Sequence, residues 1–278
     1  MTDSSRANLT SLLDYHIHSK LCGHGVGELE EYVRYAIQSG LPEMGFSEHI
    51  FMYWLPESQR DPELAMPESG FAAYVREVQR LQTAYPEIRL RLALEADFIV
   101  GHEEKLRQVL HSYEWDYLIG SVHFIDGWGI DDERYKDGFD RWDINELYEC
   151  YFDHVCRAAE TGVYQVMGHL DLVKKFGHRP TCSVADLYQR TARRLKSADV
   201  CIEVNTSGLR KPVGEMYPHP ELVKACFDAG VPVTLGSDAH QPDRVADAAL
   251  RAVDMLRDIG YTHMLRFEGQ RRERIALP

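Results

Sequence analysis

The sequence of 278 residues predicts an α/β fold built around a mainly parallel, barrel-like sheet. Short apolar runs alternate with longer amphipathic segments seven times, which is the pattern of consecutive βα units. Polar motifs rich in histidine and carboxylate follow nearly every apolar run. An open doubly wound sheet has the same local pattern, but only a closed ring brings so many strand ends to one place. The motifs therefore favour a barrel, with its active site at the carboxyl ends of the strands.

The seven predicted strands are the short apolar runs at residues 12–17, 43–46, 89–96, 117–120, 164–167, 200–204 and 231–235. The seven predicted helices are the amphipathic segments at residues 28–39, 70–84, 103–112, 145–161, 184–197, 220–229 and 243–259. Several of these helices end at a glycine, which suits the left-handed cap position. Two long insertions, at residues 51–69 and 124–143, interrupt the pattern, and long loops at the ligand end of a barrel usually shape the pocket.

Composition narrows the class of protein. A chain of this length that is 44% apolar can bury one sizeable core, and we expect a single domain over residues 1–278. The net charge of −13 argues against a nucleic-acid partner bound through a broad basic face, although it does not exclude a small anionic substrate. The sequence leaves the oligomeric state open.

Cysteine usage and hydropathy point to the cytoplasm. None of the six cysteines forms a Cys-x-x-Cys pair, so reduced and mostly buried thiols are expected. No apolar run approaches the roughly 20 residues that span a bilayer, so no membrane partner is predicted. The N-terminal residues 1–11 are polar and lack the apolar core of a signal peptide.

Five short motifs at predicted strand ends carry the chemistry. They are Asp14-Tyr15-His16-Ile17-His18, Ser47-Glu48-His49, Ser121-Val122-His123, Gly168-His169-Leu170-Asp171 and Ser237-Asp238-Ala239-His240. Histidine and carboxylate are the usual ligands of zinc, manganese and iron. Because side chains two apart on a strand share a face, both histidines of the first motif can reach one ion, and Asp14 can orient a ligand histidine. Singly each motif is weak evidence, but together they predict one metal centre and an enzyme.

Two further residues belong with these motifs. Glu95 ends an apolar strand, where a carboxylate is costly to bury unless it is paired or bound to metal. Its two oxygens make it a candidate bridging ligand between two ions. His24 lies in the glycine-rich loop 22–25, whose backbone has the freedom to bend toward a centre.

The order of these motifs resembles the polymerase and histidinol phosphatase (PHP) family of metallophosphoesterases. The resemblance covers essentially the whole chain, and the longer stretches 121–128, 168–176 and 203–212 are its most specific part. It implies a distorted (β/α)7 barrel that holds up to three divalent ions of zinc, manganese or iron. Carried over position by position, it implies three ligand groups: His16, His18, Glu95 and Asp238; Glu95, His123 and His169; and His24, His49 and His240.

The resemblance also implies the reaction, which is hydrolysis of L-histidinol phosphate to L-histidinol and phosphate in histidine biosynthesis. A hydroxide that bridges two metals would attack phosphorus, because bound metals lower the pKa of water toward neutrality. Asp238, His240 or water could protonate the leaving group. Arg210 is the first choice for a bidentate phosphate contact, followed by Lys174 and Lys175. Trp54, Trp128 and Glu215 could contact the cationic histidinol moiety.

Three alternatives remain open. The chain could be a related phosphoesterase that acts on another small ester or on a nucleotide 3′ end, although the missing basic surface argues against a nuclease. It could be a metal-binding accessory module without turnover, against which the complete ligand set argues. It could also be a metal-dependent amidohydrolase on a (β/α)8 barrel. Such enzymes ordinarily carry a metal-bridging lysine at a strand end, whereas lysines such as Lys174 fall in loops or helices here.

Overall fold

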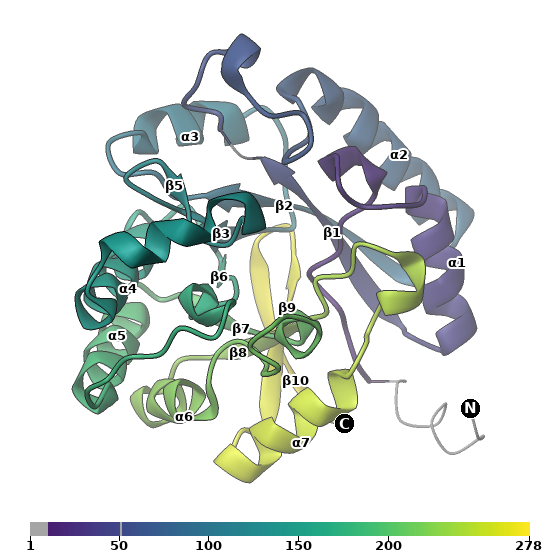
Figure 1. Ribbon diagram of the computed structural model, residues 1–278. Coiled ribbons are helices and arrows are strands. Elements are labelled where there is room, and N and C mark those ends of the chain that lie inside the picture. The colour runs from purple at the N-terminus through teal and green to yellow at the C-terminus, as the bar shows by residue number, and fades with distance from the viewer. Residues whose placement is uncertain (1–10, 51) are drawn as a thin grey trace.

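The computed structural model describes residues 11–50 and 52–278, and a curled parallel sheet lies at its centre (Figure 1). Six strands of the described residues pair in the order β1-β2-β3-β6-β7-β8, and every neighbouring pair is parallel. Their bounds are β1 Glu43–Ile50, β2 Arg89–Asp97, β3 Tyr117–Ser121, β6 Val166–Met167, β7 Cys201–Asn205 and β8 Val233–Gly236. The predicted parallel α/β architecture is confirmed. Residues 1–10 of the polar N-terminal stretch and Phe51, the first residue of one predicted insertion, lie outside the described residues.

The two edges of this sheet are joined by the segment 12–18, which the sequence predicts as the first strand. Asp14 forms a parallel bridge to Met44 of β1, and Ile17 forms one to Ala239 just beyond β8. These isolated bridges replace a continuous ladder, so the ring closes with a distortion at this point. Six of the seven predicted strands thus form the curled parallel sheet, and the segment 12–18 joins its edges through two isolated bridges and backbone hydrogen bonds to β1 and β8.

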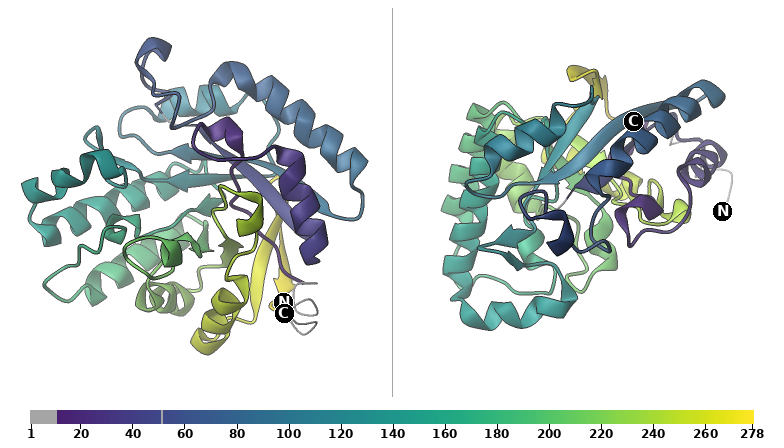
Figure 2. Two further views of the ribbon diagram at one scale, coloured as in Figure 1. Left: turned by 45° about the vertical axis from the view of Figure 1, so that its right-hand side comes forward. Right: turned by 90° about the horizontal axis from the view of Figure 1, so that it is seen from above.

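Helices surround the sheet on its outer side, as the views in Figure 2 show. Their bounds are α1 Leu29–Ser39, α2 Phe71–Ala84, α3 Glu103–Leu110, α4 Ile144–Glu160, α5 Ala185–Ser197, α6 Pro220–Ala229 and α7 Ala249–Ile259. Local sequence explains where they begin and end. A reciprocal capping box between Glu28 and Glu31 starts α1, and Gly40 ends it in the left-handed conformation at φ 80°. The last predicted helix begins late, because 242–244 forms a separate 3₁₀ turn.

Two hairpins were not predicted from the sequence. β4 (Phe124–Ile125) pairs with β5 (Trp128–Gly129) inside the second insertion, and β9 (His263–Glu268) pairs with β10 (Arg271–Ala276) at the C-terminal end. Phe267 of β9 is fully buried beside the amino end of β3. The second hairpin therefore covers the end of the barrel opposite the predicted metal ligands.

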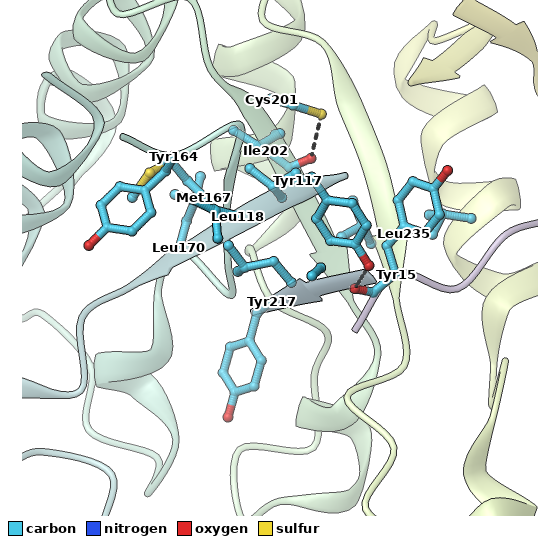
Figure 3. Close-up of a cluster of buried hydrophobic side chains, with 14 of the residues drawn as sticks. Tyr15, Tyr117, Leu118, Tyr164, Met167, Leu170, Cys201, Ile202, Tyr217 and Leu235 are labelled. Atoms are coloured by element: carbon cyan, nitrogen blue, oxygen red, sulfur yellow. Dashed lines mark hydrogen bonds between the residues drawn. The ribbon is translucent and has the colours of Figure 1, made fainter. Parts of the chain in front are cut away.

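The barrel interior is packed with large side chains. In Figure 3 the Tyr117 hydroxyl donates a hydrogen bond of 2.5 Å to the Tyr15 carbonyl, which ties β3 to the closing segment 12–18. A Cβ atom at Gly45 would overlap that hydroxyl, so only glycine fits there. All six cysteines are free and four are buried, as the sequence predicts. Of the helices in the described part of the chain, none has both the length and the apolar character needed to cross a membrane.

Candidate metal centre

The side chains predicted to bind metal converge at the carboxyl ends of the strands. They come from the closing segment 12–18, from the glycine-rich loop 22–25, from β1 and β2, and from the loops that follow β3, β6 and β8. Convergence follows from the topology, because parallel strands that curl into a ring direct their carboxyl ends to one side. The predicted residues in this cluster are His16, His18, His24, His49, Glu95, His123, His169, Asp238 and His240.

Glu95 is the centre of the cluster, as its predicted bridging role requires. One of its oxygens, Oε2, lies 3.2 Å from His16 Nε2, 3.5 Å from His18 Nε2 and 2.5 Å from His49 Nδ1. The Glu95 side chain is inaccessible to solvent. A single carboxylate oxygen thus faces imidazoles from two different parts of the barrel.

The second oxygen of Glu95 faces the other half of the cluster. Oε1 lies 2.9 Å from His169 Nε2 and 3.7 Å from His123 Nε2, and it accepts a 2.5 Å hydrogen bond from Ser121 Oγ. The two oxygens of Glu95 therefore serve two neighbouring groups of imidazoles, which suits a carboxylate shared between two ions.

Asp238 and His240 complete the cluster from the loop after β8. Asp238 Oδ1 lies 3.5 Å from His18 Nε2 and 3.4 Å from His240 Nδ1. Asp238 adopts a left-handed backbone at φ 53°, which aspartate tolerates better than most residues. His240 Nε2 faces His24 Nε2 at 2.9 Å, while His24 Nδ1 donates to the Glu63 carbonyl. The turn at Asp238 therefore places His240 Nε2 and the facing His24 Nε2 at the rim of the site.

The donors of this cluster fit divalent metal ions. Within the described residues, the buried atoms His16 Nε2, His18 Nε2 and Glu95 Oε2 have no hydrogen-bond partner, although they lie close together. Leaving such atoms unsatisfied costs about 1–3 kcal/mol each. Nitrogen and oxygen donors of this kind are the set that zinc, manganese and iron take.

The structure also shows how the donors group. Sets whose donor atoms all lie within 4.8 Å of one another are His16, His18 and Glu95; Glu95, His123 and His169; His16, His169 and Asp238; His18, His49 and His240; and Cys22, His24 and His240. The first two sets follow the ligand groups implied by the sequence. Cys22, which was not predicted as a ligand, is a further donor near His24.

Three of the buried histidines have pKa values that suit metal ligands, whereas at His16 and His123 the neighbouring carboxylates outweigh burial and raise the pKa, that of His123 to about 9. Burial lowers the pKa of His49 to about 4 and that of His240 to about 3, and it lowers the pKa of His18 well below its ordinary value. Burial alone would raise the pKa of Glu95 and Asp238, but nearby imidazoles outweigh it and hold both pKa values well below the ordinary range. Neutral imidazoles and ionised carboxylates are the forms that bind metal.

Carboxylates behind the cluster orient two of its histidines. Glu203 Oε1 accepts a 2.7 Å hydrogen bond from His16 Nδ1, and Asp97 Oδ1 lies 3.0 Å from His123 Nδ1. A Cβ atom at Gly236 would overlap Glu203 Oε1, so glycine makes room for the first pair. Such carboxylate–histidine pairs fix the ring and its tautomer in metal sites. Glu203 and Asp97 were not identified from the sequence as part of the site.

Asp14 does not have the orienting role that the sequence suggests. Its carboxylate accepts hydrogen bonds from the Ser237 backbone and hydroxyl, at 2.8 and 2.5 Å, and from the Ala246 backbone at 2.8 Å. Asp14 thus anchors the loop that carries Asp238. Glu48 also faces away from the cluster, since its Oε1 accepts from the Ser19 backbone.

Replacing Glu203 by glutamine is expected to weaken metal binding without unfolding the protein. The amide keeps a similar shape but loses the negative charge that orients His16. We expect zinc affinity and turnover to fall by roughly 10–100-fold, the usual cost of losing such a partner. Competition with a chelator and phosphate-release kinetics measure these effects. Glu215→Gln is the matched control, and equal losses in both variants would contradict the orienting role of Glu203.

The cluster opens into a cavity of about 1080 Å³. His24, His49, His123, His169 and His240 line its floor together with Asp238, while the remaining predicted ligands lie behind them. Both predicted insertions form its walls, and an ion pair of 3.0 Å between Arg134 and Asp61 connects them. The expectation that these loops shape a pocket is confirmed.

The structure separates the predicted substrate contacts into two groups. Arg210, Lys175 and Trp54 line the cavity. Lys174 is 1% exposed, and its ammonium contacts Asp171 Oδ2 at 2.9 Å and donates to the Met216 carbonyl. Lys174 therefore has a structural partner and lies outside the cavity lining.

Glu215 and Trp128 also lie outside the cavity lining. Glu215 forms an ion pair of 2.7 Å with Arg179. The Trp128 indole donates to the Tyr135 carbonyl and packs against Phe139. Because these contacts occupy the side chains of Glu215 and Trp128, we leave both residues, together with Lys174, out of the proposed substrate site.

Comparison with known proteins agrees with this geometry. Residues 14–207 match the sequence model of the PHP domain. A probable histidinol-phosphatase of Deinococcus radiodurans is 39% identical over 254 residues, which cover 91% of this chain and 95% of that protein. A probable histidinol-phosphatase of Schizosaccharomyces pombe is 29% identical over 83% of this chain and 81% of its own length.

A solved structure shares the fold. The histidinol phosphate phosphatase of Lactococcus lactis, crystallised with zinc, L-histidinol and phosphate, superimposes with a TM-score of 0.81 at 24% identity, over 95% of this chain and 99% of that one. Because the PHP match covers well over half of the chain and the similarity to relatives extends over nearly all of it, this chain belongs to the PHP domain family.

Proposed function

We propose that this chain is a histidinol-phosphatase, which hydrolyses L-histidinol phosphate to L-histidinol and inorganic phosphate. The observation that carries the proposal is a buried carboxylate, Glu95, that faces five imidazoles beneath a cavity lined by cations. The relatives with this name and the three sequence stretches named above support the substrate. Free thiols suit a cytoplasmic enzyme.

We propose that the centre holds three divalent ions of zinc, manganese or iron. His16, His18, Glu95 and Asp238 would hold the first ion, Glu95, His123 and His169 the second, and His24, His49 and His240 the third. When bound, such ions supply Lewis acidity toward the phosphoryl oxygens and make water a better nucleophile. Their charge also makes the site attractive to a phosphate dianion in a protein of net charge −13.

Asp238 and His240 are the proposed proton carriers. Because imidazoles hold the pKa of Asp238 well below its ordinary range, its carboxylate is ionised and cannot begin as the acid. Its Oδ1 can accept the proton that the attacking water loses. That proton can return to the leaving alkoxide from the same atom or through His240 Nδ1, 3.4 Å away.

Arg210 and Lys175 are the proposed cations around the phosphate. Arg210 is held in place by hydrogen bonds to Asp247 Oδ2 at 2.9 Å and to the Ser237 carbonyl at 2.7 Å. Lys175 is held by Asp131, which it contacts through the backbone carbonyl at 2.6 Å and Oδ2 at 3.0 Å. Prepositioned cations of this kind stabilise charge that develops on the phosphoryl oxygens. Trp54, in the cavity wall, is the proposed surface for the imidazole of the substrate.

A substrate panel tests the proposal. The purified protein is analysed for metals, and phosphate release is measured from histidinol phosphate, sugar phosphates and nucleotides. We expect bound divalent metal and the highest kcat/KM for histidinol phosphate. Equal rates on all small esters would leave a phosphoesterase of another specificity, which is the alternative function. Neither metal nor turnover on any ester would overturn both.

A further inference from the structure

The cavity contains five Lys and Arg side chains, and their partners differ. Arg134 contacts Asp132 at 2.7 Å and Asp61 at 3.0 Å. Arg244 lies 3.7 Å from Asp247 and 4.0 Å from Asp243. Lys175 faces Asp131 and Arg210 faces Asp247, as described above. Four of the five cations therefore already face a carboxylate.

Lys211 is the fifth cation of the cavity. Its ammonium has neither a carboxylate within ion-pair distance nor a hydrogen-bond acceptor among residues 11–50 and 52–278. Hydrogen bonds nevertheless hold the backbone of this loop in place. The Lys211 amide donates to the Gly208 carbonyl, and the Val213 amide donates to the Lys175 carbonyl. Lys211 thus carries an available charge on an anchored loop.

This difference matters for binding an anion. A phosphate that contacts Lys175 competes with Asp131, and Arg210 already commits both terminal nitrogens to acceptors. A phosphate that approaches Lys211 would displace water rather than a carboxylate, so no existing ion pair opposes the new contact. A lysine also suits a ligand that moves during a reaction, because its compact charge sits on a flexible stem.

The surroundings of Lys211 agree with this assignment. The side chain is exposed but stands within the concave cavity, and partial loss of water lowers its pKa. The neighbouring cations Lys175 and Arg210 lower it further, whereas Asp238 and Asp131 oppose them. A cation crowded by other cations gains most when a dianion arrives between them.

We propose that Lys211 is a phosphate-binding residue of this site, which contacts the phosphoryl group of the substrate and the inorganic phosphate product. The inference rests on the proposed phosphatase function. It adds a specific contact to Arg210 and Lys175, the two of the three cations expected from the sequence that line the cavity. It assigns Lys211 to the phosphate rather than to the cationic histidinol moiety, which a lysine would repel.

Titration of inorganic phosphate into the metal-loaded protein tests this assignment directly. Calorimetry is expected to show phosphate binding weakened about tenfold in Lys211→Met, as expected for one lost charged hydrogen bond. Lys211→Arg should retain most of the affinity, and Lys105→Met, at an exposed lysine of α3, should match wild type. Inhibition of turnover by L-histidinol should not weaken in any variant.

Two results would overturn the proposal. One is wild-type phosphate affinity in Lys211→Met at unchanged metal content. The other is loss of bound metal from that variant, which would place Lys211 in support of the metal shell. Neither result depends on substrate choice. Failure of the proposed function appears separately, as a wild-type enzyme with no preference for histidinol phosphate over an aryl phosphate.

Discussion

Replacing Glu95 by glutamine is expected to abolish most of the activity and to release metal. Five imidazoles lie within 3.7 Å of its two oxygens, so the carboxylate is the common partner of both halves of the cluster. An amide has one acceptor oxygen and no charge, and it cannot serve two ions. We expect kcat/KM to fall by more than the roughly 100-fold that loss of an outer partner can cost. Phosphate release and elemental analysis measure the two effects.

Glu48→Gln is the matched control for this variant. Glu48 is also a fully buried carboxylate at a strand end, but it bonds the Ser19 backbone rather than the cluster. Burial raises the pKa of Glu48 to about 7, so a neutral amide resembles a form that the native protein already populates. The control should keep its metal. A Glu95→Gln protein that retains all of its metal and most of its activity would show that Glu95 does not bridge.

The predicted metal ligands could be identified from the sequence because they share one position relative to the strands. Each follows a short apolar strand or lies in a loop beside one, and a parallel barrel brings strand ends together whatever the details of packing. The convergence of the predicted ligand residues could therefore be expected without knowing a single distance. The same reasoning placed the two insertions at the pocket, since they follow strands that carry ligands.

The residues missed by sequence reasoning depend on contacts between distant positions. Glu203 lies inside a predicted strand, and only the fold shows that it meets His16, 187 residues earlier. Lys174 and Glu215 were natural candidates for a phosphatase site, yet they contact each other at 3.4 Å across 41 residues. The charge-rich C-terminal hairpin was missed for a related reason: β10 is largely exposed, so it lacks the apolar pattern of a buried strand.

The segment 12–18 forms isolated bridges instead of a continuous β-ladder for a physical reason. This segment must pair with β1 on one side and with the chain beyond β8 on the other, at Asp14 and Ile17 respectively. The chain presents His16, between these bridges, and His18, directly after the second bridge, to the cluster. The positions that close the barrel therefore lie next to the first predicted ligands, so metal binding should stabilise the closure itself.

Removing the metals is consequently expected to destabilise the fold as well as to stop turnover. Without ions, buried donors such as His18 Nε2 and Glu95 Oε2 have no hydrogen-bond partner among the described residues. One ion present at about 1,000 times its dissociation constant stabilises the folded state by about 4 kcal/mol. For a chain of this size, that lowers the Tm of the metal-free protein by roughly 10 °C per ion. Chelation followed by thermal unfolding measures the loss, and adding back zinc, manganese or iron one at a time identifies the ion that restores both Tm and activity. A metal-free protein with unchanged Tm would show that other contacts close the barrel, and the Glu95→Gln protein should then unfold at the wild-type temperature too.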